Sequence, residues 1–188
     1  MRRLWSCWTT PTRSRRPPEA VVGAALAALA LAACSPGAPP GVDRAELDAA
    51  VSRAIGDPNS CLLIAKAGSG KLQYRYNTHT ACDRELPSCE GGGIREAAKT
   101  KLGQLLNRTA QTGAVVQLSC DSEPDGSRGV GWAAGPIAGT DLVYAAMMEG
   151  DRAFPGRMMA DRLEGAFRRA KVSKAPAGTQ APASQKAP

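Results

Sequence analysis

An uncharged apolar run near the start of the chain ends abruptly, and this limits which residues can fold together. Residues 20–33 contain only Ala, Val, Leu and one Gly. As a helix this run would measure about 21 Å, short of the ~30 Å hydrocarbon core that a membrane-spanning helix must cross. Cys34 follows, and then residues 35–41, whose prolines and glycines do not continue a helix. We therefore expect the globular part of the chain to begin after this segment.

The end of the apolar run carries a processing motif. Leu31, Ala32 and Ala33 precede Cys34, and a basic segment precedes the run, with arginines at Arg2, Arg3, Arg13, Arg15 and Arg16. This arrangement resembles the lipobox of bacterial lipoproteins. The resemblance implies that residues 1–33 are a cleaved signal peptide and that Cys34 carries acyl chains that anchor the protein to a membrane. The alternative is an ordinary secretory signal in which Cys34 lies near the cleavage site by chance.

The resemblance also suggests a location and divides the rest of the chain. Ser35 after the lipidated cysteine resembles the outer-membrane-directed pattern of some bacterial groups, so we expect an anchored protein that faces the periplasm. Residues 34–42 are expected to be the lipidated cysteine with its Pro/Gly tether. Residues 43–172 are expected to form one globular domain, and residues 173–188 a disordered Ala/Pro-rich tail.

Much of the net charge belongs to the leader. The chain has 24 basic and 17 acidic residues, a net charge of +7. Five of the basic residues and one of the acidic residues lie in residues 1–33, which leaves +3 for the remainder. So small an excess gives no indication of a nucleic-acid partner.

Four cysteines lie in the expected domain, namely Cys61, Cys82, Cys89 and Cys120. An even number in an exported domain predicts two disulfides, for which three connectivities exist. We favour Cys82–Cys89, which closes a short loop containing a proline, together with Cys61–Cys120. A zinc site of four cysteines is the alternative, but no C-x-x-C pair is present. We expect neither a metal site nor a cofactor.

Hydrophobic periodicity predicts three helices and five strands. The helices are expected at residues 43–55, where Asp43 and Glu46 form a capping-box-like start, at 94–111, and from Pro155 to Ala170. The strands are expected at residues 61–65, 71–77, 114–120, 129–134 and 142–148. The order α-β-β-α-β-β-β-α predicts a single α+β domain with a largely antiparallel five-stranded sheet and helices packed on it.

This element order is similar to that of profilin-like and roadblock-like domains, and to the α/β half of penicillin-binding and class A β-lactamase enzymes. The likeness is topological and implies no function by itself. Sheets of the first kind often associate through an edge strand or a helix, which implies a candidate homodimer. Enzymes of the second kind need an S-x-x-K motif, and no serine of this chain has a lysine three positions on. We therefore expect the catalytic apparatus to be absent.

Other catalytic patterns are incomplete as well. His79 is the only histidine, which excludes H-E-x-x-H peptidases. Residues 68–71 end in Gly-Lys but join two expected strands, so no helix N-terminus faces a phosphate there. The acidic residues of the loop 121–125 share it with Pro and Gly, and we interpret them as solvated.

Aromatic residues mark the best candidate ligand surface. Trp132 is surrounded by small residues, so a ligand ring or glycan would be able to stack on it, whereas the alternative is a place in the core. Tyr74 and Tyr76 lie in a hairpin with one solvent-facing side. The basic residues of the last helix are a second candidate, for anionic lipid or peptidoglycan, with a solvated helix face as the alternative: Arg157, Arg162, Arg168, Arg169 and Lys171.

Together these patterns predict a membrane-anchored periplasmic lipoprotein. We expect a non-enzymatic binding or envelope-assembly component, with an envelope protein or peptidoglycan as its partner. A degenerate or minimal relative of penicillin-interacting serine enzymes is the alternative.

Overall fold

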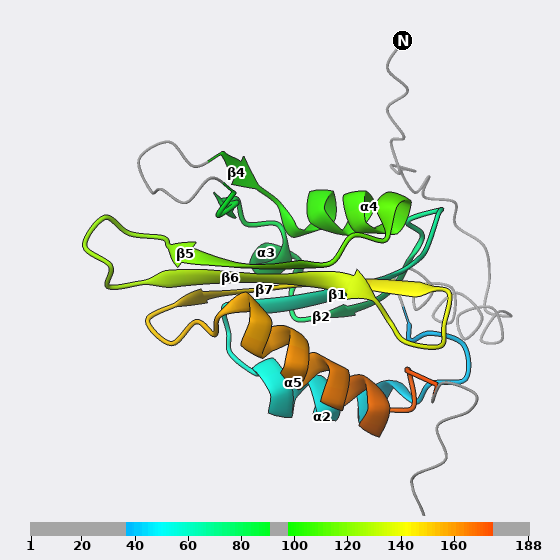
Figure 1. Cartoon of the computed structure of the whole chain (residues 1–188). Coiled ribbons are helices and arrows are strands. Elements are labelled where there is room, and N and C mark those ends of the chain that lie inside the picture. The colour runs from blue at the N-terminus through cyan, green and yellow to red at the C-terminus, as the bar shows by residue number, and fades with distance from the viewer. Residues whose placement is uncertain (1–36, 91–97, 175–188) are drawn as a thin grey trace, which may run out of the picture. The chain divides into compact units, whose positions relative to one another are not determined.

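An antiparallel sheet of five strands forms the centre of the domain (Figure 1). The computed structural model describes residues 37–90 and 98–174, so the expected signal peptide, Cys34 and nearly all of the expected tail lie outside the described residues. The predicted α+β class and the five-stranded antiparallel sheet are confirmed. The strands follow the order β2-β1-β7-β6-β5, where they span β1 (Ser60–Lys66), β2 (Leu72–Tyr76), β5 (Val116–Asp121), β6 (Gly129–Pro136) and β7 (Leu142–Gly150).

Helices cover both faces of this sheet. Figure 1 shows α2 (Arg44–Ile55) and α5 (Gly156–Arg169) on one face and α4 (Leu102–Thr112) on the other, and we call these the α2/α5 face and the α4 face. The inner strands are therefore buried on both sides, and β6 and β7 consist largely of continuous apolar residues, as expected for such strands. No helix among the described residues is long and apolar enough to cross a membrane.

Alternate strand residues feed two separate cores. On the α2/α5 face, Leu62 and Ile64 of β1 belong to the core that includes Leu47 of α2 and Leu163 of α5. On the α4 face, Leu63 of β1 and Met147 of β7 belong to the core that includes Leu102 and Trp132. The period-2 alternation of strand side chains explains why neighbours in the sequence enter opposite cores.

The predicted helix starts are right for α2 and wrong for α4. The Asp43 carboxylate accepts a hydrogen bond of 2.8 Å from the backbone N–H of Glu46, so Asp43 caps α2 as expected. The helix expected at 94–111 begins only at Leu102. Residues 91–97 lie outside the described part, and Lys99–Thr100 form a short strand, β4, that pairs with β3 (Leu86–Pro87). Extended pairing at residues 99–100 therefore replaces a part of the helix that the apolar pattern suggested.

Two glycines allow helix α5 to start close to the sheet. A Cβ on Gly156 would overlap the backbone of Leu118 and the carbonyl oxygen of Trp132. A Cβ on Gly131 would overlap the carbonyl oxygen of Phe154, in the turn that leads into α5. The absence of both side chains brings the beginning of α5 directly onto β5 and β6.

The disulfides are Cys61–Cys82 and Cys89–Cys120, with Cα separations of 5.3 and 5.4 Å. Two disulfides among these four cysteines are confirmed, but the favoured connectivity, Cys82–Cys89 with Cys61–Cys120, is wrong. Cys61 and Cys120 lie on strands separated by β7 and β6. Three strand spacings amount to about 14 Å, whereas a disulfide needs Cα atoms within about 7 Å.

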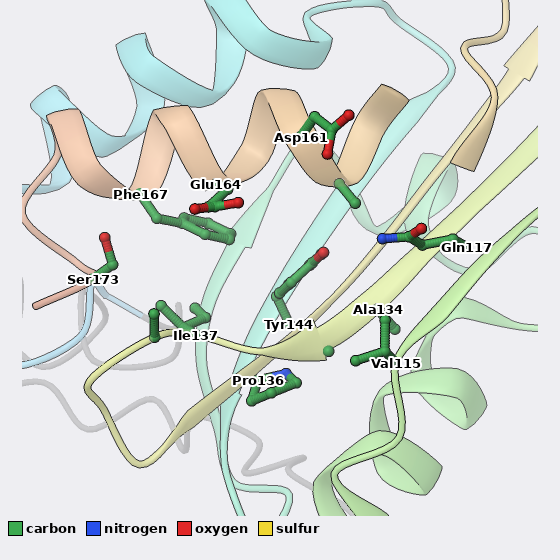
Figure 2. Close-up of a pocket in the computed structure, with 13 residues that line it drawn as sticks. Val115, Gln117, Ala134, Pro136, Ile137, Tyr144, Asp161, Glu164, Phe167 and Ser173 are labelled. Carbon is green, nitrogen blue, oxygen red and sulfur yellow. The ribbon is translucent and has the colours of Figure 1, made fainter. Parts of the chain in front are cut away.

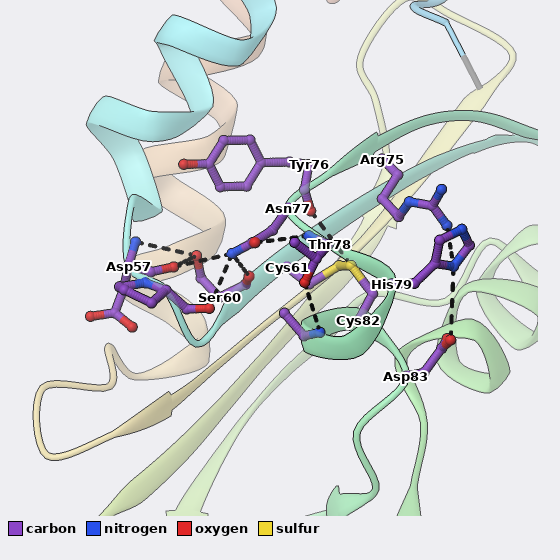
Figure 3. The surroundings of a disulfide bond; sticks show 12 residues. Asp57, Ser60, Cys61, Arg75, Tyr76, Asn77, Thr78, His79, Cys82 and Asp83 are labelled. Atoms are coloured by element: carbon purple, nitrogen blue, oxygen red, sulfur yellow. Dashed lines mark hydrogen bonds and ion pairs between the residues drawn. A yellow bond between two sulfur atoms is a disulfide. The ribbon is translucent and has the colours of Figure 1, made fainter. Parts of the chain in front are cut away.

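A short helix brings Cys82 to Cys61. It lies between the expected strand at 71–77 and the expected helix at 94–111, where no element was predicted. Helix α3 (His79–Cys82) is capped by Thr78, whose hydroxyl accepts a hydrogen bond from the N–H of Ala81. Asn77, at a φ of 77°, donates from its amide to the Ser60 carbonyl at 2.8 Å, and its Oδ1 accepts from the N–H of Thr78 (Figure 3). Asn77 therefore ties the start of α3 to the start of β1, beside the disulfide.

Candidate functional site

The aromatic surface expected at Trp132 and Tyr74 is not present, because both side chains are buried. Trp132 is 1% exposed, and its indole N–H donates to the Pro87 carbonyl at 2.7 Å. Tyr74 is fully buried, and its hydroxyl donates to the Asp48 carboxylate at 2.6 Å. Burial and the hydrogen bond to Asp48 raise the pKa of Tyr74. Tyr76 remains half-buried beside α2, so the structure does not bring the three aromatics into one surface.

His79 and the acidic loop also make local contacts only. The Arg75 guanidinium lies 2.7 Å from His79 Nδ1, on an exposed edge of α3 (Figure 3). The Asp125 carboxylate accepts from the N–H and hydroxyl of Ser127, and these bonds lower the pKa of Asp125. Within residues 37–90 and 98–174, no group of three or more His, Cys, Asp or Glu is placed to hold a metal ion.

The arginines of α5 are partly engaged within the domain. The Arg162 guanidinium lies 4.3 Å from the centre of the Phe154 ring, and Arg168 forms an ion pair with Glu164 at 2.6 Å. The cationic groups of Arg162 and Arg168 are therefore already in contact with other side chains of the domain.

A groove between α5 and the strands β5 and β6 is the better candidate site (Figure 2). Its volume is about 260 Å³. On the α2/α5 face, Gly135 of β6 is paired with Tyr144 of β7, and Val115 lies on the other side of Gly135. A Cβ on Gly135 would be at ordinary contact distance, 3.5 Å, from Val115. The groove exists because this position of β6 has no side chain.

Several polar groups meet in this apolar groove. Figure 2 shows the Tyr144 hydroxyl pointing toward α5, between Glu164 and Gln117. Burial, with the negative charges of Glu164 and Asp161, raises the pKa of Tyr144 to about 12. The phenol therefore keeps its proton at neutral pH and is available as a hydrogen-bond donor. An apolar floor with a few converging polar groups is the usual composition of a ligand pocket.

Two acceptors in the groove lack partners within the domain. The Asp161 carboxylate on α5 has no hydrogen bond or ion pair to any described residue, whereas the neighbouring Glu164 is paired with Arg168. At the other end, the Ser173 Oγ atom is buried without a hydrogen-bond partner among the described residues. Acceptors in this state favour a ligand that donates hydrogen bonds or carries positive charge.

A second polar cluster, around Glu149, was not predicted from the sequence. Glu149 of β7 is 4% exposed, and its carboxylate accepts from Arg128 at 2.8 Å and from Arg84 at 2.9 Å. The hydrogen bond from Arg128 and the contact with Arg84 lower the pKa of Glu149 to about 2. The one available signal was a charged residue at the end of a continuous apolar strand. Because each oxygen of Glu149 is satisfied, we interpret this cluster as structural.

The sequence held only a faint signal for the groove. The small residues around Trp132 suggested a ligand stacked on its ring. In the structure one of them, Gly135, instead leaves space beside Tyr144. No family of known proteins, no curated protein and no solved structure matches this chain.

Proposed function

We propose that this chain is the precursor of a lipid-anchored protein of the bacterial envelope, whose domain binds a partner through the groove between α5 and β5–β6. The anchor is proposed from the motif Leu31-Ala32-Ala33-Cys34 and the Pro/Gly segment that follows it. The two disulfides support an oxidising compartment such as the periplasm.

The observation that supports a binding role is the groove itself. Its floor is apolar, and Tyr144, Asp161 and Ser173 bring polar atoms to it that have no hydrogen-bond partner among residues 37–90 and 98–174. We propose a non-enzymatic role, since the chain lacks an S-x-x-K motif. An acyl-enzyme would form a covalent adduct with a fluorescent β-lactam, and such an adduct would contradict this part of the proposal.

Cell fractionation tests the anchor. The wild-type protein should be found in the membrane fraction. Its mass should be that of a mature chain that begins at a diacylated or triacylated Cys34. A Cys34→Ala variant should be released or remain an unprocessed precursor. Unchanged fractionation and mature mass in that variant would overturn the anchor.

Site-specific photo-crosslinking in whole cells tests the binding surface. A photoreactive residue in place of Gln117, at the groove, should give one defined adduct in the envelope. The matched control is the same residue in place of Gln111, which is exposed on α4 at the opposite face. Equal adducts from both positions, or none from Gln117, would remove the groove from the proposal.

A further inference from the structure

Strand β5 has a free edge beside the groove. It pairs with β6 on one side and has no other strand partner among the described residues. Its side chains alternate between half-buried residues that face α4 and exposed residues on the α2/α5 face. Val115, directly before β5, is 66% exposed, although it is a large apolar residue. A free strand edge next to an exposed apolar side chain is suited to the addition of an extended peptide.

The walls of the groove are placed so that a side chain of the added strand would enter it. Gln117 and Val115 line its outer wall, and α5 forms the opposite wall (Figure 2). A strand added to β5 would lie about 4.8 Å outside it, with every second side chain on the α2/α5 face. A long side chain of that strand would reach over Val115 and Gln117 toward α5.

The charges of the groove select the chemistry of that side chain. Asp161 and Glu164 line the groove on α5, and Asp161 has no partner within the described part of the domain. The Tyr144 hydroxyl and the Gln117 amide offer further hydrogen bonds. Lysine and arginine combine an apolar stem, suited to the floor beside Gly135, with a cationic end that would pair with Asp161.

A second copy of the chain fits the same edge less well. Strand β5 has the sequence Val-Gln-Leu-Ser-Cys-Asp, which contains no cation for Asp161. Pairing of two β5 strands would leave that carboxylate without a counter-charge. The charge pattern therefore favours a different segment, one that carries a basic residue.

We infer that the groove binds an extended peptide segment that pairs with the edge of β5 and places a lysine or arginine side chain between Asp161 and the Gly135 floor. This inference rests on the proposed binding function and names the class of partner. The partner would be an envelope protein with an exposed basic strand or tail.

Fluorescence anisotropy with defined peptides tests the inference on the mature full-length chain in detergent micelles. The probe is a short labelled peptide of alternating Thr and Val with one central lysine, and its counterparts carry norleucine or glutamate at that position. We expect the lysine peptide to bind about tenfold more tightly than the norleucine peptide, as for one charge-assisted hydrogen bond. The glutamate peptide should bind more weakly still.

Variants of the protein separate the two halves of the inference. Asp161→Asn should weaken binding of the lysine peptide about tenfold and leave the norleucine peptide unchanged. Its matched control is Glu46→Gln, an exposed helical carboxylate on α2. Gly135→Leu should fill the groove and abolish binding, and its control is Gly103→Leu on α4, where a Cβ would meet nothing within 4 Å. The peptide should also slow hydrogen exchange of the outward-facing amides of β5.

Several outcomes would overturn the inference. These are equal binding of the lysine, norleucine and glutamate peptides, full binding by Asp161→Asn or Gly135→Leu, or protection of amides outside β5. If hydrogen exchange of the β5 amides slows with rising protein concentration in the absence of peptide, a second copy of the chain occupies the edge. If no peptide binds while the Gln117 crosslink persists, the peptide class is wrong and the proposed function stands. If the crosslink is absent as well, both fail.

Discussion

The two faces of the sheet differ in how completely they are closed. On the α4 face, Trp132 fills the space beneath the segment 86–90, and both disulfides tie that side of the domain together. On the α2/α5 face, α5 leaves the end of β6 uncovered, and a groove of about 260 Å³ remains. The difference arises from side-chain size, because a large ring seals one face where a glycine on the same strand opens the other.

Glycines on the α2/α5 face also differ in what their missing side chains allow. A Cβ on Gly131 would overlap the turn before α5, and a Cβ on Gly156 would overlap the backbone of β5 and β6. Gly135 has no such neighbour, since the nearest atom that its Cβ would meet is a side-chain carbon of Val115 at 3.5 Å. One strand thus carries a glycine that closes the fold and a glycine that leaves it open.

The largest expected effect tests the sealed face. Trp132→Ala should lower the free energy of unfolding by about 4 kcal/mol, because it removes a fully buried ring and leaves the Pro87 carbonyl without its donor. Val115→Ala at the groove should change it by less than about 0.5 kcal/mol, because that side chain is largely exposed. Urea unfolding measures both. Similar losses of unfolding free energy from the two variants would contradict the difference between the closed α4 face and the open groove.

The disulfides come next. Replacing both Cys61 and Cys82 with Ala should lower the stability by about 3 kcal/mol, the loop-entropy value for a sequence separation of 21. Thermal unfolding under non-reducing conditions gives the loss. Peptide mapping without reduction should recover a peptide pair containing Cys61 and Cys82. A linked pair containing Cys61 and Cys120 would show that the connectivity is wrong.

Alanine substitutions at Gly131 and Gly135 are expected to differ in stability by no more than the loss of a disulfide. Gly131→Ala should cost about 2 to 3 kcal/mol, because its Cβ would overlap the carbonyl oxygen of Phe154. Gly135→Ala on the same strand should change stability by less than about 0.5 kcal/mol, since its Cβ meets only ordinary contacts. The difference between their urea midpoints is the measurement. A large loss from Gly135→Ala would mean that the groove is closed in solution.

The smallest expected effect concerns pH. Because the folded-state pKa of Glu149 is lowered from 4.5 to about 2, its carboxylate stabilises the fold fully above about pH 5, and this contribution is lost as the pH falls toward 2. We expect a contribution of about 2 kcal/mol, with some screening at the partly exposed arginines. The difference in unfolding free energy between wild type and Glu149→Gln should therefore be smaller at pH 3 than at pH 6. A constant gap would contradict this assignment.

Local patterns predicted most of the secondary structure. Asp43 and Glu46 identified the start of α2, and apolar runs, alternating in the case of β2, identified β1, β2, β5, β6 and β7 within a few residues. These predictions succeeded because helix capping and apolar strand patterns depend on residues close together in the sequence. The start of α4 failed because residues 99–100 pair with β3, which is a contact outside any local window.

Residue types and their order were enough to predict the fold class, the number of cysteines available for disulfides, and the motif from which a lipid anchor is proposed. Each depends on residue type and spacing along the chain. The pairing of the cysteines became clear only from the arrangement of the strands, because β7 and β6 separate Cys61 from Cys120. The tertiary structure also placed Trp132 in the core and opened the groove at Gly135, beside Tyr144 and Asp161. Those outcomes depend on which strands become neighbours and where α5 crosses them, and spacing along the chain does not contain that information.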